Sequence, residues 1–327
     1  MYRSILVPLD GSAFSEYALP VARAIIRRLP ADQRATLHLV RVHEPIITTY
    51  IDGLPIIDEE LDAQMRKHEE EYLNLVHTRL MHDIEIDTRC AVIDGPTAAM
   101  LIQHIKAEQI DLVVMTTHGR GGMARFWLGS TADEVVRHGA APVLMIRPPS
   151  TPVVAAEEPT FQRVLIPLDG SEIAEDILEH AAMVGGLIDA EYRLLRIVEP
   201  LMMVGYSPTA YSADLEKQVV RQQIDEAETY LASIAQRLQA QGLRVSTKVV
   251  VGQQPVTIIL KAAHEYRIDL IAMATHGRGG LSRLLLGSTA DKVLRGALVP
   301  VLLHHPLAKR GASEATPGKN VALSVGQ

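Results

Sequence analysis

Apolar and polar positions along the chain fall into blocks that predict a regular succession of strands and helices. Short apolar runs such as Ile5–Pro8 and Leu112–Met115 have the length of buried strands. Longer stretches such as Glu59–Met81 carry apolar residues at helical spacing among many charged ones. Strands that alternate with helices predict an α/β fold with a parallel sheet covered on both faces. In the first half we expect strands at Ile5–Pro8, Leu37–Val42, Ile84–Val92, Leu112–Met115 and Val143–Ile146, and helices at Ser12–Leu29, Glu59–Met81, Pro96–Glu108 and Ser130–His138.

The second half of the chain repeats the first. Ser4–Ser12 (SILVPLDGS) returns as Arg163–Ser171 (RVLIPLDGS), 159 residues later. Thr117–Asp133 (THGRGGMARFWLGSTAD) returns as Thr275–Asp291 (THGRGGLSRLLLGSTAD), 158 residues later. An offset this constant indicates two copies of one domain, and it is far longer than the roughly 20–50 residues of solenoid or propeller repeats.

The repeat predicts two similar doubly wound domains, each with a five-stranded parallel sheet, at residues 1–147 and 160–306. Residues 148–159 between them are rich in proline and lack an apolar period, which is typical of a linker. Residues 307–327 are mostly small or polar, and we expect this tail to be disordered.

The final strand of each predicted domain, Val143–Ile146 or Val301–Leu303, is short and apolar. An unpaired apolar edge strand promotes association, so something should cover it. We therefore expect the two domains to pair through these strands within one chain, and any homodimer to use a different surface.

Composition narrows the class of protein. The chain has 327 residues, of which 47% are hydrophobic, and a net charge of −7 with no basic block, which argues against nucleic acid as a partner. We expect no signal peptide, and no apolar run approaches the ~20 residues of a membrane span. We therefore expect a cytoplasmic protein with two domains and no membrane contact.

Three further expectations concern single residues. Cys90 lies in a strand-like run and is expected to be buried, and a single cysteine excludes a disulfide framework. The acidic run Glu69–Glu71 is expected on the solvent-facing side of a helix. His304 and His305 lack metal-ligand spacing, so we expect no zinc site.

The repeated glycine-rich segment has the layout of an anion-binding loop. An apolar strand comes before it, and a Gly-Ser-Thr helix start follows it, at Gly129–Thr131 and at Gly287–Thr289. Glycine lets backbone amides approach a ligand closely, and a helix start supplies free N–H groups and the positive end of the helix dipole. Because this layout occurs twice, we expect two bound phosphates or nucleotides.

These motifs make the chain resemble a tandem member of the universal stress protein family. ATP-binding members have an aspartate after the first strand and a G-x2-G-x9-G-[ST] motif after the fourth. Gly119 and Gly129 have the nine-residue spacing, and Gly277 and Gly287 repeat it. The chain departs from the motif at its first glycine, which is replaced by Thr116 in one half and Ala274 in the other, and these side chains would narrow the approach of ribose and phosphate.

The resemblance implies roles for individual residues. Asp10 and Asp169 would accept a hydrogen bond from adenine, and the backbone of Val42 and Ile197 would line its pocket. The ligand would be ATP with Mg²⁺. Its ribose and phosphates would be held by Gly119, Gly129, Ser130 and Thr131 in one half, and by Gly277, Gly287, Ser288 and Thr289 in the other.

Each loop also carries an arginine and a histidine. Arg120 and Arg278 are candidates for a phosphate contact because guanidinium keeps its charge, and the alternative is a solvent-facing or interface arginine. His118 and His276 would either contact phosphate or form hydrogen bonds within the loop.

Two other interpretations of the glycine loop are weaker than nucleotide binding. Gly129 and Gly287 could serve only as turn formers, with Ser130 and Ser288 capping the helices. A Walker loop is excluded because serine stands where that motif needs lysine after the last glycine.

The expected function is that of an ATP-binding regulatory protein of the stress response, with one nucleotide in each domain. The alternatives are an interaction scaffold of the same fold that works without nucleotide, and a slow ATPase. No general base follows from the spacing of the residues, so we do not expect an efficient enzyme.

Overall fold

A computed structural model covers the whole chain and describes residues 2–30, 35–45, 47–51, 54–81, 86–117, 128–148, 161–186, 189–200, 210–275 and 286–305. Most of the predicted linker and the whole predicted tail lie outside these residues.

The first half alternates strands and helices as expected. Its elements are β1 (Ser4–Pro8), α1 (Ala18–Arg27), β2 (Thr36–His43), β3 (Ile47–Ile51), β4 (Leu54–Ile57), α2 (Glu59–Met81), β5 (Thr88–Asp94), α3 (Thr97–Ala107), β6 (Leu112–Thr116), α4 (Ser130–His138) and β7 (Val143–Ile146). The antiparallel hairpin β3–β4 was not predicted. The predicted helix Ser12–Leu29 was too long, because its first residues form a turn and the short 3-10 helix Ser15–Tyr17.

The second half follows the same order without a described hairpin. Its elements are β8 (Arg163–Pro167), α5 (Glu172–Glu175), α6 (Ile177–Gly186), β9 (Glu191–Val198), α7 (Ala210–Gln239), β10 (Arg244–Val251), α8 (Pro255–Glu265), β11 (Leu270–Ala274), α9 (Ser288–Gly296) and β12 (Val301–His304).

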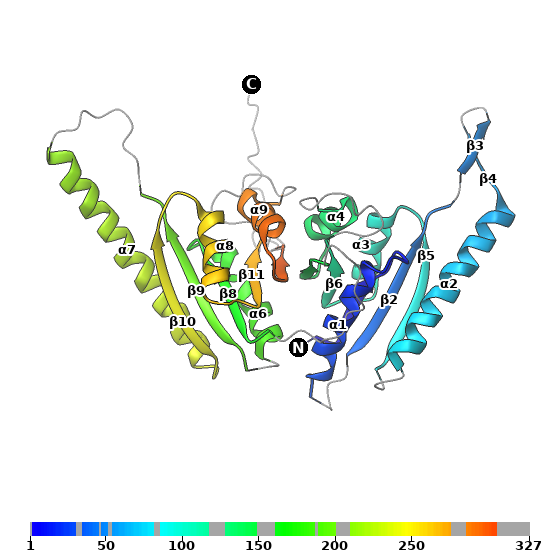
Figure 1. Cartoon of the computed structure of the whole chain (residues 1–327), viewed down its shortest axis with the longest axis horizontal. Coiled ribbons are helices and arrows are strands. Elements are labelled where there is room, and N and C mark those ends of the chain that lie inside the picture. Colours follow the sequence, from blue (N-terminus) through cyan, green and yellow to red (C-terminus); the bar gives the residue numbers. More distant parts are fainter. Residues whose placement is uncertain are drawn as a thin grey trace, which may run out of the picture.

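All described strands except β3 and β4 belong to one sheet, in the order β10-β9-β8-β11-β12-β7-β6-β1-β2-β5. Within this sheet, pairing is parallel inside each half, and the central pair, β12 with β7, is antiparallel. The predicted fold of two doubly wound domains with five parallel strands each is therefore confirmed, and so is the pairing of the domains through their last strands. Figure 1 shows the two halves joined at the centre, with the long helices α2 and α7 on the outer flanks.

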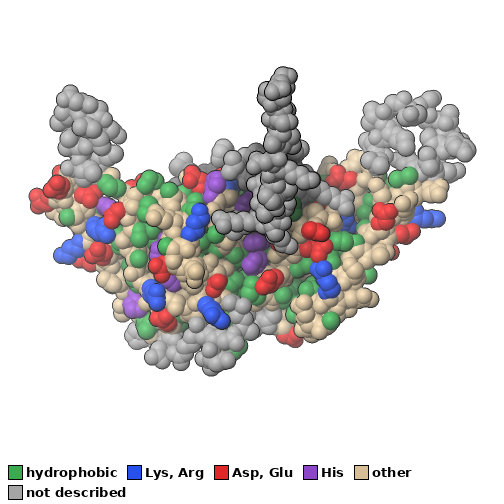
Figure 2. Space-filling view, turned by 180° about the vertical axis from the view of Figure 1, so that it is seen from behind, with side chains coloured by type: hydrophobic (Ala, Val, Ile, Leu, Met, Phe, Trp, Pro, Cys, Tyr) green, Lys and Arg blue, Asp and Glu red, His purple; other side chains and the backbone are tan. Residues whose placement is uncertain are grey.

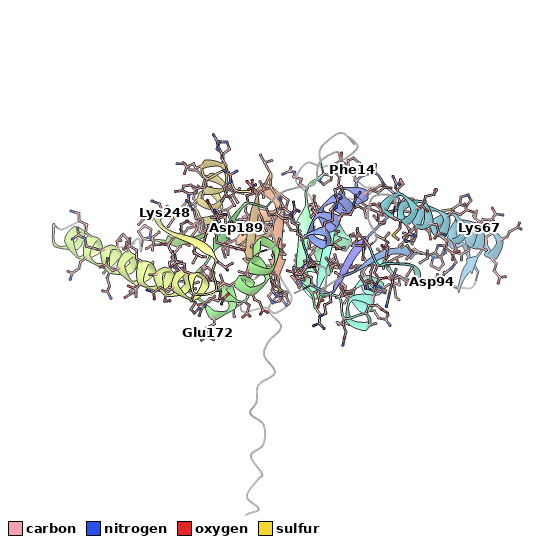
Figure 3. All side chains as sticks on the ribbon, turned by 90° about the horizontal axis from the view of Figure 1, so that it is seen from below. Phe14, Lys67, Asp94, Glu172, Asp189 and Lys248 are labelled. Carbon is pink, nitrogen blue, oxygen red and sulfur yellow. The ribbon has the colours of Figure 1, made fainter. Side chains whose placement is uncertain are left out.

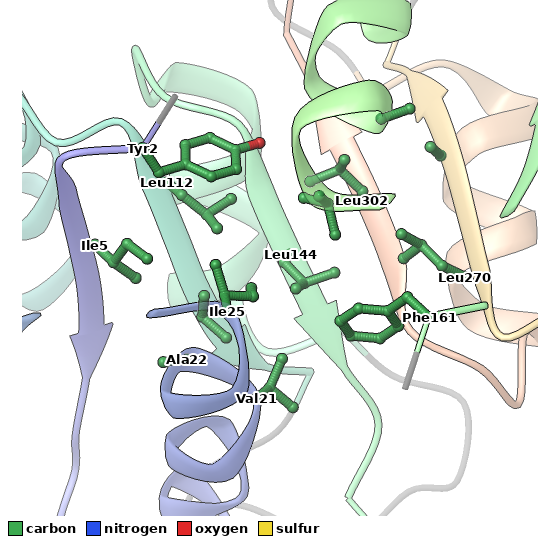
Figure 4. Packing of buried hydrophobic residues seen from close by; sticks show 14 of the residues in the cluster. Tyr2, Ile5, Val21, Ala22, Ile25, Leu112, Leu144, Phe161, Leu270 and Leu302 are labelled. Atoms are coloured by element: carbon green, nitrogen blue, oxygen red, sulfur yellow. The ribbon is translucent and has the colours of Figure 1, made fainter. Parts of the chain in front are cut away.

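The hydrophobic core runs across the boundary between the domains. Leu302 lies opposite Leu144 on one face of the sheet, and Leu303 lies opposite Val143 on the other. All four side chains are buried, and each face has one core cluster with residues from both halves. Figure 4 shows Leu144 and Leu302 side by side, with Phe161 of the second half near them. Full burial of such a side chain contributes about 1.5–3 kcal/mol, so the two domains share a substantial part of their core.

Two expectations about burial were wrong. Cys90 is exposed, because β5 is the outermost strand of the sheet and no neighbouring strand covers that edge. Glu69 is buried, because its carboxylate is paired with Arg41 and His43 of β2 rather than facing solvent. Glu70 and Glu71, by contrast, are exposed as expected.

The outer surface mixes charges of both signs. On the face shown in Figure 2, acidic and basic side chains alternate and neither sign gathers into a large patch. Among the described residues, no helix has both the length and the apolar character needed to cross a membrane.

Two half-buried histidines lie against each other in the second domain. His180 of α6 and His304 of β12 have ring centroids 4.3 Å apart, and both Nδ1 atoms are buried without a hydrogen-bond partner in the described part of the chain. Burial lowers the pKa of both, and the neighbouring His180 and His305 help to lower that of His304 to about 4. By sequence offset, Val21 and Ile146 hold the equivalent positions in the first domain.

This pair should make the protein sensitive to acid. The pKa values of both histidines in the folded state lie below the ordinary value of about 6.5. The folded state therefore keeps its stability above that pH and loses stability as pH falls below it. The free energy of unfolding of the wild type, measured by urea denaturation, should fall on the order of 2–3 kcal/mol between about pH 7 and pH 4. The double variant His180→Val, His304→Ile should not show this loss. His68→Ala, at an exposed position on α2, is the control and should keep the wild-type acid sensitivity. An unchanged acid response in the double variant would contradict this account.

Candidate functional site

The aspartate that follows the first strand of each domain lies in a tight turn. The Asp10 Oδ1 atom accepts hydrogen bonds from the Ser12 N–H at 2.9 Å and from the Ser12 hydroxyl at 2.6 Å. Asp169 and Ser171 repeat both contacts at the same distances. Gly11 between the two residues has a φ of 80°, a conformation that favours glycine. One carboxylate oxygen thus holds the turn, and this orients the carboxylate at the carboxyl end of the strand.

The strand register brings each aspartate next to the predicted adenine strand. Pro8 of β1 pairs with Val40 of β2, and the Leu9 N–H donates to the Val40 carbonyl at 2.8 Å. Asp10 follows two residues after Pro8, at the end of β1 where β2 continues to Val42. The second domain repeats this arrangement, since Pro167 pairs with Leu195 and Leu168 donates to the Leu195 carbonyl at 2.8 Å, while β9 continues to Ile197.

The glycine-rich loops close at the same edge of each sheet. The Gly129 N–H donates to the Thr117 carbonyl at 2.9 Å, and the Gly287 N–H donates to the Thr275 carbonyl at 2.8 Å. These bonds join the end of β6 to the start of α4, at Ser130, and the end of β11 to the start of α9, at Ser288. Because these are parallel strands, the helix starts lie at the carboxyl edge that also carries Asp10 and Asp169.

The backbone at the last glycine of each motif is ordinary. Gly129 has φ −61° and ψ 146°, and Gly287 has φ −55° and ψ 140°, values that any residue adopts. A Cβ atom added to Gly129 would first meet the Thr117 carbonyl oxygen at 3.4 Å, an ordinary contact. Among the described residues, neither local strain nor packing therefore requires glycine at position 129.

Several predicted site residues lie outside the described part of the chain: His118, Gly119, Arg120, His276, Gly277 and Arg278. Thr131 and Thr289 lie in the first turns of α4 and α9. Thr116 and Ala274, the departures from the family motif, are buried as the last residues of β6 and β11.

One repeated group next to the turn was missed. The Tyr72 hydroxyl donates to Glu16 at 3.0 Å, and Arg79 pairs with the same carboxylate at 2.8 Å. In the second domain Arg237 pairs with Glu175 at 2.7 Å. Burial raises the pKa of Tyr72, and the Glu16 carboxylate raises it further. The group joins α2 to the turn after β1. Its signal in the sequence is a repeat: Glu16, Tyr72 and Arg79 return as Glu175, Tyr230 and Arg237 after 158 or 159 residues.

No group of three or more His, Cys, Asp or Glu side chains in the described ranges has the arrangement of a metal site.

Comparisons with known proteins agree with the repeat. The model of the universal stress protein family matches residues 1–147 and 160–305. A universal stress protein of Methanocaldococcus jannaschii is 30% identical over 151 residues, which cover 46% of this chain and 86% of that protein. One from Mycolicibacterium smegmatis is 26% identical over 311 residues, covering 92% of this chain and 97% of that protein.

A solved structure shares the fold over nearly the whole length. The crystal structure of a universal stress protein from Archaeoglobus fulgidus has a TM-score of 0.61 and 20% identity, and the match covers 92% of this chain and 96% of that one. The match of the family model to both halves, together with the repeated fold, shows that this chain belongs to the universal stress protein family.

Proposed function

We propose that each domain binds ATP with Mg²⁺, and that the bound nucleotide regulates the shape or the partners of the protein during the stress response. Adenine would contact Asp10 and the backbone of Val42 in the first domain, and Asp169 and the backbone of Ile197 in the second. Ribose and phosphates would contact the loops and helix starts, at Gly119, Arg120, Gly129, Ser130 and Thr131, and at Gly277, Arg278, Gly287, Ser288 and Thr289.

The observation that carries this proposal is the ordinary backbone at the last glycine of each motif. A glycine that serves only as a turn former needs a positive φ or a crowded backbone, and Gly11 shows such a positive φ. Gly129 and Gly287 do not have a positive φ, yet both copies of the motif have glycine there. Close approach of a ligand explains this choice.

The helix starts add an electrostatic argument. The first N–H groups of α4 and α9 have no partner within their helix, and the dipole makes these ends positive. Ser130 and Ser288 are the first residues of their helices and follow N-cap glycines, which have no side chain to cap the helix. N–H groups and hydroxyls at a positive helix end favour binding of a phosphate.

Removing the aspartates tests the adenine assignment. We expect Asp10→Ala and Asp169→Ala each to weaken ATP binding at one site by about 1–3 kcal/mol, the usual cost of leaving a polar contact unmatched. Selectivity for ATP over GTP should fall at that site. Titration calorimetry with both nucleotides measures the two effects.

Asp111→Ala is the matched control. The Asp111 Oδ2 atom accepts hydrogen bonds from the Arg3 and Ser4 N–H groups at 2.7 and 3.1 Å, at the opposite end of β1. This variant should lose stability but keep its selectivity. If Asp10→Ala behaves like Asp111→Ala, the aspartates are turn formers and the adenine assignment is wrong.

A further inference from the structure

Four charged side chains form a network between β2 and α2 in the first domain. The His43 Nδ1 atom lies 2.8 Å from Glu69 Oε2, and its Nε2 atom lies 3.1 Å from Asp62 Oδ1. Arg41 Nη2 donates to Glu69 Oε1 at 2.8 Å. Arg41, His43 and Glu69 are buried, while Asp62 is partly exposed. The network therefore joins the carboxyl end of β2 to the first turns of α2.

The geometry requires a charged histidine. Each ring nitrogen of His43 faces a carboxylate oxygen, and neutral imidazole has only one N–H to donate. Only imidazolium donates to both Asp62 and Glu69. Burial by itself lowers the pKa of His43, but the hydrogen bonds and charges of the two carboxylates outweigh burial and raise it.

The second domain lacks this network. Val198 and Ala227 stand at the positions of His43 and Glu69, and Ala227 is buried. The equivalent of Arg41 is Arg196, whose Nη1 atom donates to the Leu168 carbonyl at 3.4 Å, next to Asp169. In the second domain this arginine contacts the strand end that carries the aspartate, whereas in the first domain it contacts α2.

The network lies directly beside a residue of the proposed nucleotide site. Val42 stands between Arg41 and His43, and the His43 carbonyl accepts a hydrogen bond from Gly95 at 2.9 Å. The next residue, Glu44, accepts hydrogen bonds from Thr97 at the start of α3. A change in the network would therefore move the backbone that we assign to adenine.

We propose that this network makes nucleotide binding in the first domain dependent on pH, because it holds the Val42 backbone in place only while His43 is charged. The inference rests on the proposed function. The site in the second domain has no equivalent group and should bind independently of this switch.

Other charged groups around His43 are paired elsewhere. Arg66 of α2 forms an ion pair with Asp94, the β5 residue in register with His43. Figure 3 shows Asp94 at the outer flank of the domain. The Arg41 Cζ atom lies over the Tyr72 ring, 6.0 Å from the ring centroid. Asp62 and Glu69 are thus the acidic groups that set the charge of His43.

The direction of the effect follows from the raised pKa. Below the ordinary value of about 6.5, His43 is charged whether or not the network is formed, and the network is intact. As pH rises through the higher folded value, the ring loses one N–H and leaves a carboxylate oxygen facing a lone pair. The strand end then loosens, so affinity at the first site should fall as pH rises.

The test measures each site alone. Gly287→Val leaves the first site and Gly129→Val leaves the second, and both are titrated calorimetrically with ATP and MgCl₂ between about pH 6 and pH 9. We expect affinity at the first site to fall by about tenfold or more relative to the second, within the range of ordinary coupling between sites. The second site corrects for the titration of ATP itself. Identical pH profiles would overturn the proposal.

Variants within the network identify the cause. His43→Val with Glu69→Ala introduces the residues of the second domain and should remove the pH dependence. Asp62→Asn is a milder change that should reduce it if the double variant fails to fold. Glu70→Ala is the matched control, because Glu70 is exposed and, in the described part of the chain, forms its ion pair within α2, with Arg66 at 3.5 Å. If ATP affinity at the first site still depends on pH without the network, the inference is contradicted.

Failure of the proposed function gives a different result. If neither site binds ATP at any pH, the nucleotide assignment is wrong, and the network is tested by amide hydrogen exchange. Protection of residues 42–44 should then decrease with rising pH relative to residues 197–199, after correction for intrinsic exchange. If the protection of both segments changes with pH in the same way, the proposed role of the network is overturned.

Discussion

The double variant Val143→Lys, Val301→Lys is expected to separate the two domains. Both valines are buried in the central strands, where β12 pairs with β7. An unpaired ammonium group in this core costs several kcal/mol, a large part of the 5–15 kcal/mol that typically stabilises a folded protein. Separation should increase the radius of gyration in solution scattering and speed proteolytic cleavage between residues 148 and 160.

The control for this experiment is Val251→Lys. Val251 ends β10 at the outer edge of the same sheet and is 43% exposed, so lysine there should leave the domain pair intact. Circular dichroism distinguishes separation from unfolding, because separated domains keep their helical signal. If the double variant keeps the compact shape and the slow cleavage of the wild type, the central strand pair does not hold the domains together.

Gly129→Val and Gly287→Val are each expected to remove one nucleotide site. A branched side chain at the helix start would occupy the space that phosphate needs, and its Cβ at position 129 fits the protein without a clash. We expect affinity at the altered site to fall more than about 100-fold, roughly 3 kcal/mol. Calorimetry should then give one site per chain in each variant and none in the double variant.

The corresponding alanine variants serve as graded controls. Gly129→Ala adds only the Cβ atom, 3.4 Å from the Thr117 carbonyl oxygen, and should weaken binding less than valine does. Melting temperatures close to the wild-type value would show that the loss is local to the site. Full binding of two nucleotides by both valine variants would refute the assignment of the glycine loops.

The repeat was the strongest guide to the fold. Two copies of each strand and helix start predicted the parallel sheets, and the apolar final strands Val143–Ile146 and Val301–Leu303 predicted the central pair of β7 with β12. These features depend on local patterns, which a sequence displays directly. The hairpin β3–β4 was missed because its sequence, ITTYIDGLPII, does not return in the second half, so the repeat provided no signal for it.

The burial of Glu69 depends on partners that are distant in sequence. Its partners Arg41 and His43 are 28 and 26 residues away, and nothing in the run Glu69–Glu71 indicates which of its members faces β2. The helical register provides that information, since Glu69 lies one turn before the buried Leu73. Cys90 was assigned to the core because an apolar strand was assumed to be covered, whereas β5 is an edge strand.

The candidate site was predictable in part. The position of Asp10 at the carboxyl end of β1, next to β2, follows from the pattern of parallel strands, and the helix starts at Ser130 and Ser288 were predicted at the correct residues. The group of Glu16, Tyr72 and Arg79 was not predicted, because its members come from two separate helical segments. Only the fold brings such side chains together.

The most direct test of the account is native mass spectrometry of the full chain, gently purified and supplied with ATP and Mg²⁺. We predict that each chain carries two molecules of ATP, one in each domain. Denaturation should release the nucleotide, and the spectrum should identify it. A chain that remains free of nucleotide at saturating ATP would contradict the central claim and would leave a scaffold that works without nucleotide as the function of this protein.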